Sequence, residues 1–586
     1  MRFHRVWIAG MLVLACGDPS GLERAPHNVS ITQDQTWSRA DSPHLVRGTV
    51  SVSNGATLTI EAGATVLFDS LAMLTLGGRG GTGRLLALGS AAAPITMGNL
   101  REDAGPGAWT GIRFRSNTAS ELHHVNVSGC GGDVKPAANG LRYDSIPPAC
   151  LSLGNPLLPE ERATILIDHV TVEEARGGAV TLWNGSGFAD GSSVLSVRNV
   201  KGYIARMRTR EAARFPLGGT FTGIDTNEVR LAADTLSDSL TLASGVPWAV
   251  EDTVRIEGPS EPVLTIPAGA TILLSGSFWV GEHVPGGLQI GSDGGPTVSL
   301  LPRSTTWEGL EFREYAVRSS VENAVLESCG TEGMPCLSIV GSFTGGPAPA
   351  PLLRNVTIRN SVNAGLMMSH GGRPGPGSAN VTVTGAKGDA VAVSQSPVGS
   401  VPSGQYTGNT YDRIWIYDTD IRQDDTWHQR GVPYYIAGLV SVGDATTRPT
   451  LTIEPGVTVI SGGVRISVGE ATPGAIHAVG TEAEPIVFTG VADRPGSWTG
   501  IVVGYRADSS TVFDHVVVDY AGGQYVVEGS FHFYRDLGPI IRNSTIRNSA
   551  SCGVIIVNQP PWSTDFTAPE LGNTFTDNAR GSVCGP

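Results

Sequence analysis

One apolar decapeptide occurs three times in this chain of 586 residues. TLTIEAGATV at 57–66 returns as VLTIPAGATI at 263–272 and again as TLTIEPGVTV at 450–459. Recurrence at long, similar intervals is the signature of a tandem repeat architecture, in which each unit buries its apolar face against a neighbour. The repeat therefore restricts the fold to one that can be extended by stacking copies of the same structural pattern.

Other sequence marks recur in the same order around the decapeptide. A Trp-x-Gly signature follows it each time, at Trp109, Trp307 and Trp498. A lead-in, ITQDQTW at 31–37, is matched by IRQDDTW at 421–427. We interpret the chain as a triplication. The predicted organisation is a signal peptide at 1–16, a tether at 17–28, and three modules at 29–224, 225–411 and 412–586.

Within a module the apolar residues follow the period of a β-strand. Leu58 and Ile60 alternate with Thr57 and Thr59, whereas no segment keeps the i, i+3, i+4, i+7 spacing of an amphipathic helix. The sequence predicts many short strands and almost no helix.

The residues between successive strands indicate bends rather than hairpins. Pro455 and Gly456 supply the fixed and the positive φ angles of a type II turn, and Gly63 and Gly269 keep the glycine in the other copies. Two-residue hairpin turns such as Asn-Gly are almost missing between apolar runs. A chain of this kind winds around a narrow core, with each coil placing Val, Ile and Leu on those of the next coil.

The runs LTIEPG, NSTIRNS and PIVF followed by WTGI resemble right-handed parallel β-helix repeat proteins of the pectate-lyase-like superfamily. The resemblance covers nearly everything after residue 28. It implies an all-β, right-handed parallel β-helix, or solenoid. That architecture carries lyases, hydrolases, epimerases, adhesins and inert scaffolds, so the resemblance implies a fold without implying an activity.

The N-terminus has the composition of an export signal. Arg2 and Arg5 precede an apolar run at 6–14 that is too short to span a bilayer. The small-residue ending before Cys16 resembles a bacterial lipobox, which implies cleavage before Cys16 and acylation of its thiol. An ordinary secretory peptide with an incidental cysteine is the alternative. By resemblance to enteric sorting rules, Gly17 favours the outer membrane, so we expect an exported protein, lipid-anchored in the cell envelope.

Six further cysteines remain, and an even number in an exported chain favours disulfides. Pairing the nearest ones predicts Cys130–Cys150, Cys329–Cys336 and Cys552–Cys584. A zinc site is the rival interpretation, but the sequence has no CxxC motif and no Cys/His group with ligand spacing.

The charge distribution excludes nucleic acid as a partner. The net charge is −14, only three residues are lysine, and the arginines form no basic stripe of the kind that neutralises phosphates. The partners that we expect are a membrane, through the lipid anchor, and a polysaccharide.

Histidines beside carboxylates are the first candidates for chemistry, because such a pair can act as a general base with its orienting group. The candidates are His123-His124, Asp168-His169 and Asp514-His515. Aligning the repeats, however, places His169 on Asn355 and Asn543. A polar residue before a Val-x-Val strand suits a coil corner, where Asn or His can bond turn amides and stack in a ladder. We therefore predict a structural role for these histidines.

Carboxylates are densest in YDTDIRQDD at 417–425. Asp418, Asp420 and Asp424 are candidates for a shared Ca²⁺, because hard oxygen ligands suit that ion. The alternative is a capping and turn segment, since Asp424 has a counterpart in Asp34. Ca²⁺ is the one cofactor that the sequence suggests.

No residue is assigned as catalytic. The sequence lacks a Gly-x-Ser-x-Gly elbow between a strand and a helix, and every cysteine has another expected use. Aromatic residues that break the threefold pattern are candidates for stacking on sugar rings. They are Trp183, Trp415, Tyr434, Tyr435 and Trp562.

Two functional hypotheses follow. The first is a non-catalytic, surface-anchored lipoprotein with a structural, adhesive or polysaccharide-binding role, since presentation and multivalent binding gain from repeated copies. The second is a polysaccharide lyase or a glycoside hydrolase. A lyase would need Ca²⁺-binding carboxylates beside an arginine such as Arg413 or Arg422, and a hydrolase would need two facing carboxylates.

Overall fold

The computed structural model describes residues 26–78, 81–116, 119–133, 148–523, 529–557 and 563–585. Cys16, the predicted signal peptide, most of the predicted tether and Trp562 lie outside these residues. The chain divides into two compact units, Met1–Val229 (unit 1) and Arg230–Pro586 (unit 2). The division falls close to residue 225, the predicted start of the second module, and unit 2 contains nearly all of the predicted second module and the whole of the third.

Unit 1 consists of short parallel strands. Its strands are β1 (Gln35–Trp37), β2 (His44–Val46), β3 (Thr49–Val52), β4 (Thr57–Glu61), β5 (Thr65–Phe68), β6 (Met73–Leu76), β7 (Arg84–Leu88), β8 (Ile95–Asn99), β9 (Gly111–Phe114), β10 (Ser120–Ser128), β11 (Ala149–Leu153), β12 (Thr164–Glu173), β13 (Gly178–Leu182), β14 (Gly187–Phe188), β15 (Leu195–Arg198), β16 (Tyr203–Arg208) and β17 (Phe221–Thr222). An 11-stranded sheet runs in the order β1-β4-β7-β10-β12-β15-β17, with β2, β5, β8 and β14 paired alongside. A second parallel run follows β3-β6-β9-β11-β13-β16.

Unit 2 repeats this construction over a longer stretch of chain. Its strands, starting with β18, which contains the boundary between the units, are β18 (Thr226–Ala232), β19 (Asp234–Leu236), β20 (Leu240–Thr241), β21 (Trp248–Val250), β22 (Val254–Ile256), β23 (Val263–Ile266), β24 (Thr271–Leu274), β25 (Ser277–Val280), β26 (Gly287–Ile290), β27 (Val298–Pro302), β28 (Gly309–Phe312), β29 (Ser320–Glu327), β30 (Leu337–Val340), β31 (Leu352–Arg359), β32 (Leu366–Ser369), β33 (Ala379–Thr384), β34 (Asp389–Ser394), β35 (Gly404–Gln405), β36 (Tyr411–Ile416), β37 (Thr419–Ile421), β38 (Asp425–Trp427), β39 (Tyr434–Ile436), β40 (Val440–Val442), β41 (Thr450–Ile453), β42 (Thr458–Ser461), β43 (Arg465–Val468), β44 (Ala475–Val479), β45 (Ile486–Gly490), β46 (Gly500–Val503), β47 (Val512–Asp514), β48 (Val516–Asp519), β49 (Gly529–Phe533), β50 (Ile541–Arg542), β51 (Thr545–Arg547), β52 (Cys552–Ile556), β53 (Thr574–Thr576) and β54 (Gly581–Cys584).

Three of the sheets in unit 2 have 14, 7 and 5 strands. The longest runs β19-β22-β25-β28-β30-β32-β34-β36-β39-β42-β45-β48-β51-β53. The only helical elements among the described residues are three 3₁₀ segments, η1 (Thr209–Arg214), η2 (Val398–Ser400) and η3 (Pro569–Leu571). The protein is therefore all-β, with long all-parallel sheets of stacked strands, consistent with a β-solenoid.

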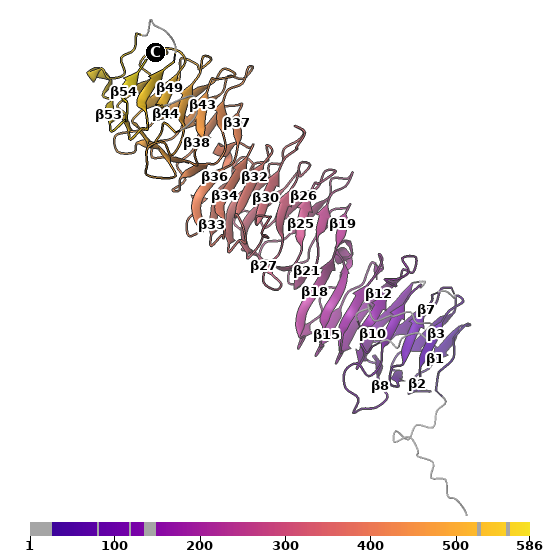
Figure 1. The fold of residues 1–586 in the computed structure, drawn as a ribbon. Helices are drawn as coiled ribbons and strands as arrows, with labels where there is room; N and C mark the ends of the chain where they lie inside the picture. Colours follow the sequence, from indigo (N-terminus) through magenta and orange to yellow (C-terminus); the bar gives the residue numbers. More distant parts are fainter. Residues whose placement is uncertain are drawn as a thin grey trace, which may run out of the picture. The chain divides into compact units, whose positions relative to one another are not determined.

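Successive strands of one sheet lie side by side and point the same way (Figure 1). Residues that meet across neighbouring coils are separated by 23 residues at Asp34 and Thr57 and by 32 at Asn323 and Asn355. Inside the coils, aliphatic side chains stack on one another. Leu58 is paired with Leu85 in this way, and both are fully buried. Each coil thus supplies the apolar surface that covers the next one.

The Trp-x-Gly signature has the same structural use in all three copies. The indoles of Trp109, Trp307 and Trp498 are buried, and each Nε1 donates to a backbone carbonyl oxygen, at 2.8, 2.9 and 2.8 Å. The glycine that follows Trp307, Gly309, has a φ of +109°, and a Cβ there would lie 2.6 Å from the carbonyl oxygen of Cys336. Packing of the coil therefore explains this motif.

The turn chemistry of the decapeptide is also observed. Gly63, Gly269 and Gly456 have φ angles of +79°, +78° and +76°, which fit the position that a type II turn reserves for glycine.

Three disulfides join the cysteines that are nearest in sequence, as the sequence predicts. They are Cys130–Cys150, Cys329–Cys336 and Cys552–Cys584. Disulfides persist in oxidising compartments, so they indicate an extracytoplasmic protein.

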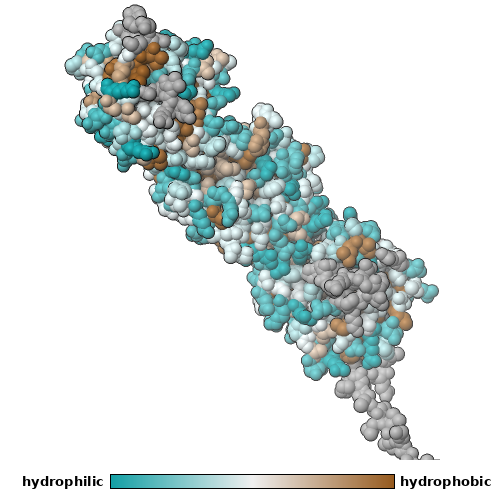
Figure 2. All heavy atoms as spheres, in the orientation of Figure 1, coloured by the Kyte–Doolittle hydropathy of each residue, from teal (hydrophilic) through white to brown (hydrophobic). Residues whose placement is uncertain are grey.

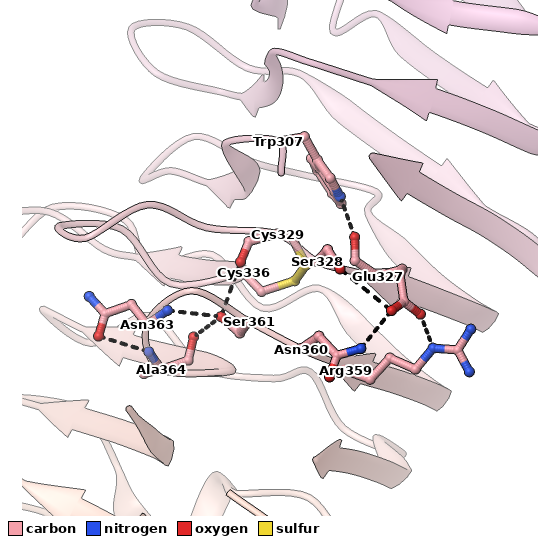
Figure 3. Close-up of a disulfide and its surroundings, with 10 residues drawn as sticks. All are labelled: Trp307, Glu327, Ser328, Cys329, Cys336, Arg359, Asn360, Ser361, Asn363 and Ala364. Atoms are coloured by element: carbon pink, nitrogen blue, oxygen red, sulfur yellow. Dashed lines mark hydrogen bonds and ion pairs between the residues drawn. A yellow bond between two sulfur atoms is a disulfide. The ribbon is translucent and has the colours of Figure 1, made fainter. Parts of the chain in front are cut away.

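The Cys329–Cys336 bridge lies in a polar corner that ties neighbouring coils together (Figure 3). The backbone oxygen of Glu327 accepts the indole N–H of Trp307, and its carboxylate forms an ion pair with Arg359. The same carboxylate accepts a hydrogen bond of 2.7 Å from the side chain of Asn360. The disulfide therefore lies beside both the buried indole of Trp307 and the ion-paired carboxylate of Glu327.

Over the described ranges, no helix is long and apolar enough to cross a membrane. The face of the molecule in Figure 2 is mostly hydrophilic, with small, separate hydrophobic patches.

Candidate functional site

Asparagines stack at one corner of unit 2. Asn323, Asn355 and Asn380 have left-handed φ angles of 47°, 53° and 55°. The amide nitrogen of Asn355 donates to the amide oxygen of Asn323 at 2.9 Å, and that of Asn380 donates to Asn355 at 3.0 Å. This is the polar ladder that the repeat alignment predicts.

Histidines occupy the equivalent corner elsewhere. His124, His169 and His515 also have left-handed φ angles, between 46° and 54°. Nδ1 of His169 lies 2.7 Å from Asp168, and Nδ1 of His515 lies 2.8 Å from Asp514. Because the same local pair forms at corners of both units, the pairing follows from corner geometry and is no evidence for a general base.

The strongest candidate for a ligand site is an open groove in unit 2, here called the 343–425 groove. It consists of two adjoining cavities of about 430 and 220 Å³ that share Gln395, Asp420 and Arg422. The larger is lined by Ser342, Phe343, Gly345, His370, Gln395, Asp418, Asp420 and Arg422. These residues follow or belong to β30, β32, β34, β36 and β37. Four successive coils therefore each contribute one part of its wall.

An exposed aromatic ring lies at one side of this groove. Phe343 is 75% exposed, and its ring centroid lies 4.0 Å from that of His370. The turn that carries Phe343 is held by a hydrogen bond of 3.2 Å from the Thr344 N–H to the Ser342 hydroxyl. Nδ1 of His370 is buried without a hydrogen-bond partner. The groove thus offers an apolar platform beside polar groups.

The three calcium candidates line the groove, but their carboxylates do not come together as one set of ligands. Asp420 pairs with Arg422 at 2.9 Å, and Asp424 accepts the backbone N–H of Thr450 at 2.8 Å. Among the described residues, Asp418, Asp420 and Asp424 are not a group whose ligand atoms lie within 4.8 Å of one another. Asp424 therefore links neighbouring coils, as Asp34 does by accepting the backbone N–H of Thr57.

Asp425, which the sequence analysis did not name as a calcium candidate, is less exposed than Asp418, Asp420 and Asp424. Burial raises the pKa of its carboxyl group, against the backbone N–H groups of Gly399, Thr426 and Val398 that lower it. The donors from Val398 and Gly399 come from η2, so this carboxylate anchors a loop at the rim of the groove.

An aromatic stripe continues along β36. Tyr411 and Tyr417 are 50% and 57% exposed, and the rings of Trp415 and Tyr417 lie 5.5 Å apart. Arg413 lies over Tyr411 at 4.4 Å and over Tyr435 at 4.0 Å, and it forms an ion pair with Asp389. Residues 413, 415 and 417 share one face because side chains alternate along a strand, and Tyr411 lies beside them through its contact with Arg413, across a register shift between 411 and 414.

One of the predicted sugar-stacking rings is buried. Tyr434 is 1% exposed, and its hydroxyl donates to the backbone oxygen of His428 at 2.6 Å, so its predicted exposure is wrong. Burial raises the pKa of this phenol. Trp183 is only partly exposed, with the guanidinium of Arg206 5.0 Å from its ring.

A second polar cluster of unit 2 is held together by ion pairs and ring contacts, although Oε2 of Glu311 and Nε of Arg313 are buried without hydrogen-bond partners. Trp279 of β25 lies between the guanidiniums of Arg255 and Arg313, each 4.7 Å from the ring. Arg313 also pairs with Glu282 at 3.2 Å and with Glu311 at 3.1 Å. Burial raises the pKa of Glu311. The cluster therefore stabilises adjacent coils through its ion pairs and ring contacts.

Comparison with known proteins adds no assignment: no family model, no curated protein and no solved structure matches this chain.

Proposed function

We propose that this protein is a non-catalytic, lipid-anchored β-helix protein that binds a neutral, hydroxyl-rich polysaccharide along the 343–425 groove and the aromatic stripe of β36. The observation that carries the proposal is the exposed ring of Phe343 in a cavity of about 430 Å³. Pockets of this size suit small ligands and short segments of larger ones.

The chemistry of the groove favours sugars. An exposed ring face packs against the C–H face of a sugar, while carboxylates and the Gln395 amide can bond its hydroxyls. Four carboxylates lie along the groove with a single arginine, Arg422; they are those of Asp418, Asp420, Asp424 and Asp425. This balance of charge favours a neutral polysaccharide over an acidic one.

The proposed architecture is a right-handed parallel β-helix of three modules. It is supported by the recurring decapeptide and by the identical packing of the three Trp-x-Gly tryptophans. The membrane part rests on the lipobox-like sequence before Cys16. Two or more acyl chains would hold the protein stably at a membrane, where a single chain would be marginal.

The test is a glycan array with neutral and acidic polysaccharides, followed by calorimetric titration of the best ligand. We expect Phe343→Ala to weaken binding by about tenfold, because a ring contact contributes roughly 1.5 kcal/mol at most. The control is Tyr505→Ala, which removes a ring of similar exposure, 53%, that does not line the groove. Equal loss in both variants, or no binding to any glycan, would reject the proposal.

The same polysaccharides also test the catalytic alternative. Incubation with the protein, followed by assays for unsaturated ends and for reducing ends, reports a lyase or a hydrolase. The appearance of either product, abolished by Asp420→Asn, would replace a binding role with an enzymatic one.

A further inference from the structure

We propose that His124, Asp168 and His169 form a binding site for a divalent transition-metal ion such as Zn²⁺ on unit 1. Each of the three side chains offers a ligand atom, and these atoms lie within 4.8 Å of one another. The residues come from two coils, since β10 and β12 are paired in parallel with His123 opposite Asp168. His124 therefore stacks on His169, with ring centroids 4.6 Å apart.

This corner differs from the other corners of the same kind. Where asparagine follows asparagine, each amide donates to the asparagine of the preceding coil, so the ladder satisfies its own polar groups. Two stacked imidazoles cannot do this, because their N–H and lone-pair directions lie in the ring planes. The His515 corner has no stacked histidine partner among the described residues, since Asn543 takes the next position and bonds Asp514. The His124–His169 pair thus keeps nitrogen lone pairs available.

The carboxylate beside the rings is held in position by two hydrogen bonds. Asp168 accepts one from the Ser193 hydroxyl and one from Nδ1 of His169. Nδ1 of His123 lies 3.6 Å from the same carboxylate, which adds a further contact between the two coils. One carboxylate beside two imidazoles is a ligand set that suits Zn²⁺, Cu²⁺ or Ni²⁺ rather than Ca²⁺.

The site can close on an ion with little movement. Zinc lies about 2.0–2.2 Å from nitrogen and oxygen ligands, so bound ligand atoms are roughly 3.3 Å apart. Nδ1 of His169 and the Asp168 carboxylate now lie 2.7 Å apart in a hydrogen bond, and the ion would replace the proton of that bond. The ring of His124 would turn towards the ion. His169 has a side chain that is 54% exposed, which leaves room for this adjustment and for a water ligand.

The experiment is calorimetric titration of the full chain with Zn²⁺, with Ca²⁺ as the comparison ion. We expect one Zn²⁺ site, which Ca²⁺ does not fill. His124→Asn and Asp168→Asn should each weaken it by about 100-fold or more, because each removes a ligand. Asn occupies the same corner conformation at 323, 355 and 380, so His124→Asn keeps the fold, and an unchanged thermal midpoint without metal verifies this.

Two matched variants separate this site from others. His515→Asn removes the isolated Asp-His pair and should leave Zn²⁺ binding unchanged. His283→Gln disrupts the second ligand group, Glu257, Glu282 and His283, and should also leave it unchanged. The proposal is overturned if the chain binds no Zn²⁺, if binding survives both His124→Asn and Asp168→Asn, or if His283→Gln removes it. Glycan binding is a property of unit 2 and is not affected by these outcomes.

Discussion

At the scale of single residues, the corners of the coils depend on side chains that tolerate a left-handed backbone. Asn323, Asn355 and Asn380 combine that conformation with amide hydrogen bonds from coil to coil. Asparagine accepts this conformation more readily than other non-glycine residues because its short polar side chain bonds locally. Each corner asparagine therefore stabilises the fold in two ways. It accepts the left-handed backbone conformation, and its side chain bonds to a neighbouring coil.

Asn355→Ala should lower the free energy of unfolding by about 2–3 kcal/mol, because it removes two hydrogen bonds and places alanine at a φ of 53°. Asn355→Gly keeps the backbone conformation accessible and should cost less. Urea denaturation of both variants measures the difference. Equal losses in the two variants would mean that backbone conformation plays no part.

His532 gives a residue-scale prediction on pH. It is 4% exposed, both ring nitrogens lack hydrogen-bond partners, and burial lowers its pKa to about 4, with Arg465 acting in the same direction and Glu470 opposing. Since this value is below the 6.5 of the unfolded chain, the unfolded state binds more protons between the two. The stability from neutral His532 is thus complete above about pH 6.5 and is lost as the pH falls towards 4.

Replacing His532 by Leu should remove this dependence. The difference in unfolding free energy between His532→Leu and the parent should grow by roughly 3 kcal/mol as the pH falls from 7 to 4, in favour of the variant. Urea titrations at several pH values measure it, and carboxylates common to both proteins cancel. A difference that stays constant with pH would show that His532 does not titrate in this way.

At the scale of elements, neighbouring strands are joined by outward-facing charges as well as by the core. Across β22, β25 and β28, the ring of Trp279 separates Arg255 from Arg313. Arg313 is the main partner of Glu311, whose side chain is 8% exposed. Arg255, Trp279 and Arg313 can contact one another only because the coils that carry β22, β25 and β28 stack in register.

Arg313→Leu should destabilise unit 2 by about 3 kcal/mol, because it leaves the buried Glu311 carboxylate without its ion pair. Adding Glu311→Leu should restore most of the loss, since the unpaired charge is then absent. A double-mutant cycle by urea denaturation measures the coupling. Additive losses would contradict the pairing.

At the scale of the whole molecule, the three disulfides indicate an extracytoplasmic protein, and the lipobox-like sequence before Cys16 predicts a lipid anchor. We predict that Cys16→Ser abolishes incorporation of labelled palmitate in a bacterial host and moves the protein from the membrane to the soluble fraction. The matched control, Cys552→Ser with Cys584→Ser, removes two other cysteines and should keep the label. An unlabelled parent protein would instead favour an ordinary secretory signal.

Much of the fold could be predicted from the sequence, whereas the groove could not. Strand periodicity, the glycine turns and the pairing of nearest cysteines are local features, and the structure contains each of them. Phe343, His370 and Gln395 come from separate coils, and nothing in the local sequence of any one marks it as a neighbour of the others. Tyr434 illustrates the same limit, because only packing against Trp427, at 5.2 Å, decides that it is buried.

The sequence by itself determined that the chain forms short strands with bends between them and that apolar residues face a shared interior. These properties depend on the alternation of side chains and on the φ angles that glycine and proline allow. Only the tertiary structure decided which outward side chains meet, such as His124 over His169 or Phe343 beside His370. The reason is that coils differ in length, from 23 to 32 residues at the contacts cited, so lateral neighbours are set by the stacking of whole coils.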